Sequence, residues 1–524
     1  MNPVLIIATR GSDLALWQAN YVAAKLNSIG VKTELNIIKT QGDKIQHLSL
    51  EKLEGKGFFT KEIEDALLNN EADIAVHSHK DLPTESHPDL MIAAVSDRED
   101  PSELLLIRKE SVDARQKFSL KKNAVVGTSS SRRKSQLLAF RKDIELKDLR
   151  GNVPTRIDKL RKGDYDAILI ASAGVERLEL DISDLHAEKL NPKEFVPAPA
   201  QGVLAIQIRK GENDLYQKLQ AIHKSEIALQ IGIERKVLNL FQGGCQMPVG
   251  AYCEYDEDRE VYKTWVSKSV TWDQLPVSIY TESKNQEGLA EKIVAKIKSV
   301  KPASVFISRN LKTDDYFHRI LGHHGFTVEG KSLIEMKPTP VRSIPVTDWI
   351  FFSSKHAVKF FFLQKPDIGN QKFGCIGKAT AEAIRKYGRR ADFIGYSTDT
   401  KMTGKQFASR VGDGTVLFPM AKESMRSVQN GFVKREQTID LVVYETLKTD
   451  VQIQTSDFDV FLFTSPSNVE AFFEKNKLTS SHKVIAMGEA TSSALKKHGV
   501  LHPALPDDFN DVALARATFG ISSI

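Results

Sequence analysis

A single cysteine in a glycine-rich turn has the setting for covalent chemistry. Cys245 stands in the segment Phe241-Gln-Gly-Gly-Cys-Gln-Met-Pro-Val-Gly250, between a helical run and a strand led by Pro248. A thiol becomes a good nucleophile when it is accessible and its pKa is depressed. The preceding Gly-Gly pair gives the backbone freedom to accommodate a bulky adduct. We expect the other two cysteines, Cys253 and Cys375, to be buried structural thiols.

Arginine and hydroxyl side chains recur where a strand gives way to a helix. The three segments 6–12, 126–133 and 149–156 each read as a buried strand end, a short polar loop and a helix start. Helix N-termini attract anions, and an arginine fork matches a carboxylate in bidentate fashion. One such loop could be a simple helix cap. Three in one half of the chain favour a site for several carboxylates, with these residues as the strongest set: Thr128, Ser129, Ser130, Arg132 and Arg133.

Asp81 is the candidate for proton transfer. It closes His77-Ser-His-Lys-Asp81, just past the buried strand 73–76. Open α/β sheets place their ligands at the carboxyl ends of strands, and a carboxylate there can stabilise a cation and carry a proton. An aspartate after a strand is more often a helix cap or a surface charge, so its position alone does not assign a role.

The elements that must position these residues alternate along most of the chain. Short β-branched runs predict buried strands, and the segments between them have helical patterns, which is typical of α/β layers. Lys298–Ala303 is interpreted as a linker. The predicted strands are 4–7, 73–76, 124–126 and 167–170, and the predicted helices are 13–26, 61–68, 132–140, 156–161 and 288–297.

Composition limits the class of protein. A chain of 524 residues suggests three to five domains, and 41% hydrophobic with 27% charged residues is typical of a globular protein. A net charge of +6 argues against a nucleic-acid partner and fits small acidic ligands better. Three cysteines suggest a reducing compartment. With no signal-peptide pattern and no apolar run of roughly 20 residues, we expect a cytoplasmic protein with no membrane partner.

The last two hundred residues contain an internal repeat. Trp349-Ile-Phe-Phe-Ser-Ser354 recurs as Val460-Phe-Leu-Phe-Thr-Ser465, and Ile376-Gly-Lys-Ala-Thr380 recurs as Met487-Gly-Glu-Ala-Thr491. Both pairs are separated by 111 residues, so no insertion interrupts the register. The repeat predicts two similar α/β lobes built from duplicated units.

Together, the Cys245 turn, Ala8-Thr-Arg-Gly-Ser12, His77–Asp81 and Leu149-Arg-Gly-Asn-Val-Pro-Thr-Arg156 resemble porphobilinogen deaminase (hydroxymethylbilane synthase) from about Val4 to Ile297. The resemblance implies a dipyrromethane cofactor bound covalently through Cys245, porphobilinogen as substrate, and catalysis by Asp81. It implies cofactor contacts from Lys80, Ser129, Arg132 and Arg133. It implies substrate contacts from Arg10, Ser12, Lys56, Thr128, Arg150, Arg156 and Arg177. The Glu54–Gly57 loop that holds Lys56 could also be a plain surface turn.

Residues 301–524 resemble uroporphyrinogen-III synthase through the repeat, Val443-Tyr-Glu-Thr446 and Phe463-Thr-Ser-Pro466. The resemblance implies hydroxymethylbilane as substrate and Tyr444 as the group that assists departure of hydroxide. A tyrosine with a satisfied hydroxyl in the core is the alternative for Tyr444. The positions implied to hold the substrate are Ser353, Ser354, Gly377, Thr380, Ser465 and Thr491.

The expected architecture is α/β throughout: two periplasmic-binding-protein-like lobes and a small α+β domain, followed by a two-lobed synthase. The expected domains are 1–98 with 195–218, 99–194, 219–300, 301–338 with 450–524, and 340–446. We expect a monomeric bifunctional enzyme that makes uroporphyrinogen III and needs no metal. The alternatives are an active deaminase with a non-catalytic synthase-like half, and a two-domain solute-binding module.

Overall fold

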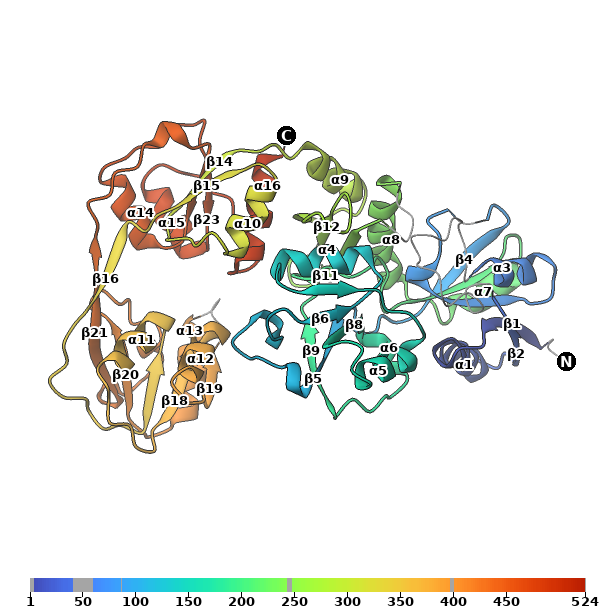
Figure 1. Cartoon of the computed structure of the whole chain (residues 1–524), viewed down its shortest axis with the longest axis horizontal. Coiled ribbons are helices and arrows are strands. Elements are labelled where there is room, and N and C mark those ends of the chain that lie inside the picture. The colour runs from blue at the N-terminus through green and yellow to red at the C-terminus, as the bar shows by residue number, and fades with distance from the viewer. Residues whose placement is uncertain (1–3, 41–59, 86, 243–246, 396–399, 524) are drawn as a thin grey trace.

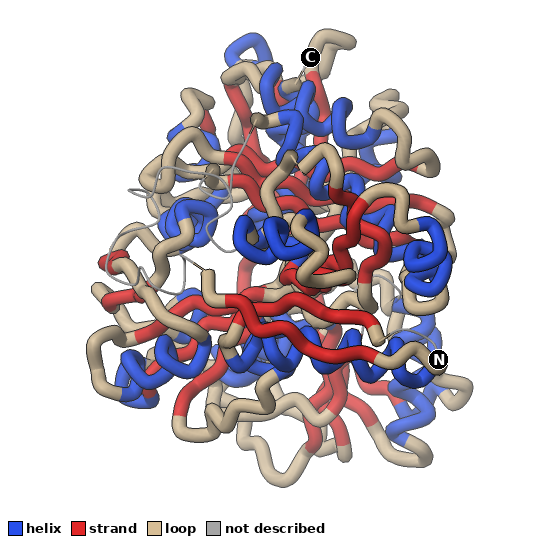
Figure 2. The backbone as a smooth tube through the Cα atoms, turned by 90° about the vertical axis from the view of Figure 1, so that its right-hand side faces the viewer, coloured by secondary structure: helices blue, strands red, loops and turns tan. Residues whose placement is uncertain are grey.

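The computed structural model describes residues 4–40, 60–85, 87–242, 247–395 and 400–523. Within them, five sheets and their helices lie along an extended molecule, with the N-terminal part at one end and the C-terminal half at the other (Figure 1). Seen from the N-terminal end, helices and strands are mixed throughout the molecule (Figure 2). The mixed α/β architecture expected from the sequence is confirmed.

The first sheet has the strand order β2-β1-β3-β10-β4. Its interior strands are continuous apolar runs because helices cover the sheet. Strand β10 arrives from much later in the chain and pairs antiparallel with β3 and β4. The strands are β1 (Leu5–Arg10), β2 (Thr33–Ile38), β3 (Ile74–Ser78), β4 (Leu90–Val95) and β10 (Leu204–Arg209), and the helices are α1 (Asp13–Ser28), α3 (Lys61–Leu68) and α7 (Asn213–Gln220).

The second sheet has the order β7-β6-β8-β5-β9 and the same strand–loop–helix design. Two of its helices start on polar caps, Ser130 before α4 and Asn152 before α5. The strands are β5 (Glu103–Arg108), β6 (Val125–Gly127), β7 (Glu145–Lys147), β8 (Ala167–Ala171) and β9 (Leu185–Leu190), and the helices are α4 (Ser131–Phe140), α5 (Val153–Arg161) and α6 (Ser172–Arg177).

A small antiparallel sheet follows, in the order β11-β12-β13. The buried Glu234 carboxylate of its helix α8 ties the N-terminal parts together, because it pairs with Arg98 at 2.7 Å and accepts the backbone N–H groups of Ala200 and Cys253. The elements are α8 (Ser225–Leu240), β11 (Val249–Asp256), β12 (Val261–Lys268), β13 (Val277–Ser283) and α9 (Leu289–Ser299).

The C-terminal half has two further sheets. The parallel sheet β15-β14-β22-β23 consists of β14 (Ser304–Ile307), β15 (Thr327–Gly330), β22 (Val460–Phe463) and β23 (Lys483–Ala486), with α10 (Tyr316–His323), α14 (Pro466–Phe473), α15 (Glu489–Lys497) and α16 (Asp511–Ser522). The sheet β16-β21-β20-β17-β18-β19 consists of β16 (Ile334–Pro338), β17 (Trp349–Phe352), β18 (Lys372–Ile376), β19 (Phe393–Gly395), β20 (Val416–Ala421) and β21 (Thr438–Lys448), with α11 (Lys355–Leu363), α12 (Gly377–Arg385) and α13 (Thr400–Val411).

The 111-residue repeat corresponds to two copies of one strand–helix–strand–helix unit. Ser354 caps α11 by accepting the N–H of Ala357, and Ser465 caps α14 by accepting the N–H of Asn468. Strand β16 pairs with β21 in the second lobe's sheet, although the sequence suggested that the first lobe extends to residue 338. Short 3-10 helices complete the fold: η2 (His79–Asp81), η3 (Lys109–Ser111), η4 (Lys117–Ser119), η5 (Gln429–Gly431), η6 (Arg435–Gln437) and η7 (Thr455–Asp457).

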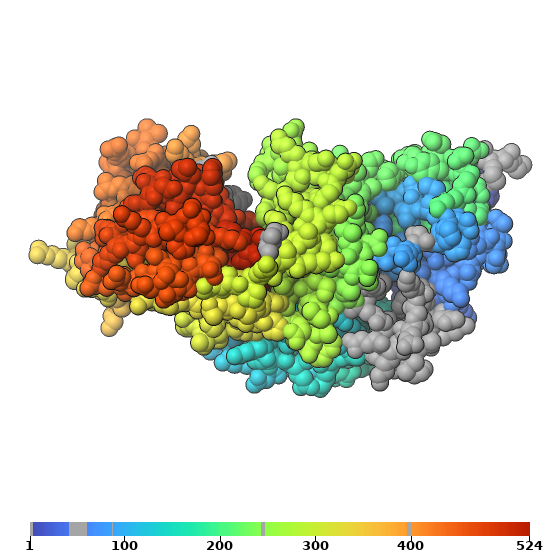
Figure 3. All heavy atoms as spheres, turned by 90° about the horizontal axis from the view of Figure 1, so that it is seen from above, coloured from blue at the N-terminus to red at the C-terminus, as the bar shows by residue number. Residues whose placement is uncertain are grey.

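The expected linker is shorter than predicted, and it joins parts that share one core. Helix α9 continues to Ser299 and β14 begins at Ser304. One hydrophobic cluster contains Val266 and Ile279 of the small sheet together with Phe317 and Phe519 of the C-terminal half. The space-filling view shows the yellow-green and yellow segments in continuous contact around this junction (Figure 3). None of the described helices is both long and apolar enough to cross a membrane.

Candidate active sites

A cavity of about 110 Å³ lies between the first and second sheets. One wall comes from α1 and the end of β3, and the other from α4, α5 and α6. Four cationic residues that the sequence singled out separately line this one cavity: Lys80, Arg133, Arg156 and Arg177. The fold therefore gathers dispersed positive charges around a single space.

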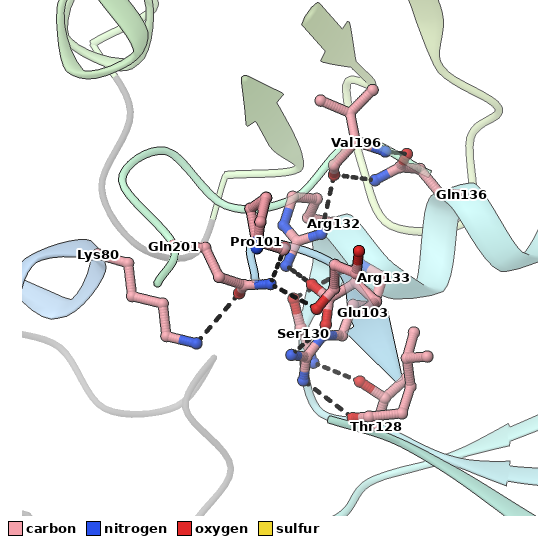
Figure 4. Close-up of polar contacts among 12 residues, drawn as sticks. Lys80, Pro101, Glu103, Thr128, Ser130, Arg132, Arg133, Gln136, Val196 and Gln201 are labelled. Carbon is pink, nitrogen blue, oxygen red and sulfur yellow. Dashed lines mark hydrogen bonds and ion pairs between the residues drawn. The ribbon is translucent and has the colours of Figure 1, made fainter. Parts of the chain in front are cut away.

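Two adjacent arginines at the start of α4 are held by one buried carboxylate (Figure 4). Glu103 accepts from Arg132 at 2.5 Å and from Arg133 at 2.6 Å. The Nη1 atom of each arginine donates to a backbone carbonyl, Arg132 to Val196 at 3.0 Å and Arg133 to Leu169 at 2.9 Å. The Nε atom of Arg133 is buried without a hydrogen-bond partner. Glu103 thus fixes both arginines while leaving their combined charge positive.

The charged groups in this cluster shift one another's pKa values. Burial alone would raise the pKa of Glu103, but the Arg133 and Arg132 guanidiniums outweigh that effect and hold its pKa at about 2. Burial lowers the pKa of Arg132. Burial, with repulsion from Arg133 and Arg150, lowers the pKa of Arg156 to about 10. Since Arg156 stays protonated at neutral pH, the cavity is prepared for anionic groups.

Lys80 lines this cavity from η2, the turn after β3, and Asp81 is the next residue of the same turn. The Lys80 ammonium donates to the side-chain oxygen of Gln201 at 3.1 Å, and burial lowers its pKa to about 8. Asp81 is exposed, and its charge acts on both Lys80 and Arg156. Because Arg156 belongs to the second sheet, Asp81 lies close enough to act on groups from both walls.

The remaining predicted residues of this site have structural partners of their own. Arg177 donates to the Gly202 carbonyl at 2.7 Å and lies over the Trp17 ring, and burial lowers its pKa. Ser12 caps α1, the Thr128 hydroxyl accepts the N–H of Ser130, and the Ser129 hydroxyl donates to the Leu149 carbonyl. Arg10 ends β1, and burial lowers the pKa of Arg150 in the loop before α5.

Two predicted residues, Cys245 and Lys56, lie outside the described residues. The other two cysteines are buried, as expected, and burial raises the thiol pKa of Cys253 and of Cys375 to about 12. Among the described residues, no group of three His, Cys, Asp or Glu side chains could hold a metal ion.

Sequence reasoning missed Glu103, because its partners Arg132 and Arg133 are about thirty positions away and no local pattern joins them. It also assigned no role to Gln201. The only signal for Glu103 was a carboxylate at the start of the apolar run 104–107, where a buried charge requires partners.

In the C-terminal half, Tyr444 and Ser354 come together. The pKa of Tyr444 is raised mainly by burial, and the side chain of Ser354 partly offsets this rise. The Tyr444 ring stacks on Phe360 with centroids 5.0 Å apart. The phenol is therefore neutral at physiological pH and can donate a proton, a property that a buried core tyrosine would share.

The other predicted synthase positions are divided between the two lobes. Ser353 is exposed before α11, and Gly377 begins α12 with a φ of +73°, which glycine adopts without strain. Ser465 belongs to the other lobe, where its hydroxyl binds the backbone and side chain of Asn468. Thr380 and Thr491 are buried in equivalent positions of α12 and α15.

Two α/β lobes enclose a cavity lined with guanidinium groups, and this arrangement is suited to ligands that carry several carboxylates. Residues 5–217 match the family model for porphobilinogen deaminase, dipyromethane cofactor binding domain. Residues 315–515 match that for uroporphyrinogen-III synthase HemD. The chain belongs to the porphobilinogen deaminase family and carries a uroporphyrinogen-III synthase domain, so it is a bifunctional enzyme of haem biosynthesis. The non-catalytic alternative for its C-terminal half is not favoured.

The relatives are similar over the N-terminal half. The porphobilinogen deaminase of Nitratiruptor sp. is 45% identical over 257 residues, which are 49% of this chain and 81% of the relative. That of Sulfurimonas denitrificans is 41% identical over 56% of this chain and 92% of the relative. The structure of uroporphyrinogen-III synthetase from Helicobacter pylori covers 40% of this chain and 96% of its own, with 16% identity and a TM-score of 0.31.

Proposed function

We propose that the chain joins four porphobilinogen molecules into hydroxymethylbilane, with release of ammonia, and then closes this product to uroporphyrinogen III with the last ring inverted. The observation that carries the proposal is the cavity lined by Lys80, Arg133, Arg156 and Arg177. Each porphobilinogen ring brings an acetate and a propionate, so a growing chain accumulates carboxylates that such a cavity can bind. The two family matches supply the reaction class.

The cationic cluster fits a dipyrromethane cofactor. Arg132, Arg133 and Lys80 would hold its carboxylates, with Ser129 beside them, and Cys245 would bind it covalently. The unpartnered Nε–H of Arg133 is a donor suited to such a carboxylate. When bound, dipyrromethane supplies the pyrrole end on which the product is built.

Asp81 is proposed to move the proton. Its exposed carboxylate stands at the end of η2, where its charge acts on residues of both walls. A carboxylate at this position can accept a hydrogen bond from a pyrrole N–H, stabilise positive charge on the incoming ring, and take up the proton lost after carbon–carbon bond formation. Substrate carboxylates would be held by Arg10, Ser12, Lys56, Thr128, Arg150, Arg156 and Arg177.

In the second enzyme, folding of the linear substrate matters more than strong acid or base chemistry. We propose that Ser353, Ser354, Gly377, Thr380, Ser465 and Thr491 bind hydroxymethylbilane through hydroxyl and backbone groups. Tyr444 would protonate the departing hydroxide, and its neutral phenol supports that role.

We propose the domain boundaries suggested by the sequence, with β16 reassigned to the second lobe. We also propose that the protein is a cytoplasmic monomer.

The test is to supply porphobilinogen to the purified full-length protein, oxidise the products and separate the uroporphyrin isomers by chromatography. Mainly isomer III is expected, since free hydroxymethylbilane closes spontaneously to isomer I. Mainly isomer I would overturn the synthase activity. Absence of porphyrin from folded protein would overturn the deaminase activity. Mass spectrometry of the peptide containing Cys245 tests the covalent cofactor directly.

A further inference from the structure

The first synthase lobe contacts the deaminase through a seam that includes buried charge. Arg516 of α16 pairs with Asp507, and these two side chains are only 1% and 4% exposed. The Asp507 carboxylate also accepts the indole N–H of Trp265, in β12 of the deaminase, at 2.7 Å. Arg516 in turn donates to the backbone carbonyl of Lys193, in the segment that follows the second sheet. A buried charge that is fully partnered across a seam fixes the geometry of the groups that it joins.

This seam leads directly to a cofactor-binding arginine. Three residues beyond Lys193, the Val196 carbonyl accepts from the guanidinium of Arg132 at 3.0 Å. Val196 also exchanges two hydrogen bonds with the side chain of Gln136, on the same helix as Arg132 (Figure 4). The synthase therefore holds one end of a four-residue segment, and the deaminase site depends on the other end.

Helix α4 makes a second connection. Its N-terminal turn carries Arg132 and Arg133, and its ten residues span about 15 Å. At the C-terminal end, the Phe140 ring stacks on Tyr316 of synthase helix α10 with centroids 4.9 Å apart. Arg319 of the same synthase helix donates to the Leu138 carbonyl at 2.9 Å. A short rigid helix anchored at one end transmits a displacement to the other.

We propose that the first lobe of the synthase is a positioning element of the deaminase: through Arg516 on Lys193 and through Tyr316 and Arg319 on α4, it sets the orientation of Arg132 and Arg133. This inference rests on the proposed function of those two arginines. Arg516, Tyr316 and Arg319 are positioning residues, because they act through the segment 193–196 and through α4. The fusion then contributes to the first reaction as well as to the second.

The test uses full-length protein with Tyr316→Ala, and with Arg516→Gln combined with Asp507→Asn so that no buried charge is left unpaired. The matched control is Tyr387→Ala, which removes a tyrosine stacked on Phe362 within the second synthase lobe. Three quantities are measured: kcat and KM for porphobilinogen, the synthase rate on hydroxymethylbilane supplied separately, and amide hydrogen exchange in residues 131–140 and 193–197.

We expect kcat/KM for porphobilinogen to fall roughly threefold to tenfold in both seam variants, with faster exchange in the two segments and a synthase rate within about twofold of wild type. Tyr316→Phe, which keeps the stacked ring, should restore wild-type behaviour. Faster exchange with unchanged deaminase kinetics would overturn the proposal, as would an equal loss in Tyr387→Ala.

If the double variant unfolds and loses both activities, the proposal is tested with Tyr316→Ala alone. The same kinetic and hydrogen-exchange results then support or overturn it. Wild-type protein that forms no hydroxymethylbilane would instead refute the proposed function itself.

Discussion

The two candidate sites of this chain are built from different kinds of groups. The deaminase cavity gathers buried cations whose geometry is fixed by a network, with Glu103 between Arg132 and Arg133 and with Gln201 on Lys80. The predicted synthase positions are mainly hydroxyl groups, several of which also cap helices or lie in the core, such as Ser354, Ser465 and Thr491. One site is dominated by charge and the other by neutral donors.

The difference teaches which sites can be recognised from structure alone. Buried charge is costly unless it is partnered, so a cluster with excess positive charge and an unpartnered Arg133 Nε–H is suited to bind an anion. A serine that caps a helix already has a structural reason to be there. The same hydroxyl can contact a ligand, but its geometry does not indicate one. Substitutions in each site distinguish side chains that bind a ligand from side chains that have only a structural role.

The largest effect is expected from Asp81→Asn, which removes the proposed proton carrier next to Lys80 of the charged site. The deaminase kcat should fall by about 10²–10⁴-fold, whereas the synthase rate on supplied hydroxymethylbilane should not change. The steady-state rate with porphobilinogen measures this loss. Asp89→Asn, at an exposed carboxylate in the turn before β4, is the control. Comparable rates in the two variants would remove Asp81 from the mechanism.

Glu103→Gln should produce the next largest effect, on stability. It leaves Arg132 and Arg133 buried without their carboxylate, and breaking a buried ion pair costs about 3–5 kcal/mol. Urea unfolding monitored by tryptophan fluorescence measures the change. The control Glu110→Gln, which breaks the exposed pair with Arg108, should cost at most about 1 kcal/mol. Equal costs would show that the buried network does not hold the site together.

Candidate residues were easier to choose from the sequence in the deaminase half than in the synthase half, for the same physical reason. Arg132, Arg133, Arg156 and Lys80 could be chosen from strand–loop–helix patterns, because open α/β sheets bind their ligands at the carboxyl ends of strands. The structure confirms the strands and helices that carry them. Glu103 could not be chosen, since its role exists only through contacts that the fold brings together over about thirty residues.

The hydrophobic core that the small sheet shares with the C-terminal half could not be predicted from the sequence. Residues 298–303 have the polarity of a linker, and nothing local shows that Phe317 and Phe519 pack with residues of the small sheet. The internal repeat, in contrast, could be detected from the sequence, because its 111-residue offset is a property of the sequence itself. Periodicity and local charge can be read from one chain, whereas packing between distant segments requires the fold.

In the neutral site, Tyr444→Phe is expected to have a smaller effect. Loss of the phenol proton donor should slow the synthase about tenfold and raise the fraction of isomer I formed from porphobilinogen. Deaminase kinetics should be unchanged. Isomer analysis after oxidation gives the readout, and Tyr387→Phe, an exposed tyrosine of the same lobe, is the control. A wild-type isomer ratio in Tyr444→Phe would favour the alternative that Tyr444 is a core residue with a satisfied hydroxyl.

The smallest effect concerns pH and the charged site alone. Burial lowers the pKa of Lys80 to about 8, so its positive charge is present at pH 7 and is lost as pH rises through 8. At pH 9 only about one tenth of Lys80 remains protonated, and kcat/KM for porphobilinogen should fall several-fold between pH 7 and 9. Lys80→Arg, whose charge persists, should flatten this alkaline decline.

Lys122→Arg, at an exposed position, should leave the decline unchanged. If kcat/KM of Lys80→Arg declines with pH as that of wild type does, another group titrates. The decline in kcat/KM then cannot be assigned to Lys80. A flat pH profile in Lys80→Arg would instead show that the deaminase depends on the positive charge of Lys80, whose pKa burial lowers. The synthase step, which relies on neutral donors, should show no matching decline with supplied hydroxymethylbilane over this range, and this contrast separates the chemistry of the two sites within one molecule.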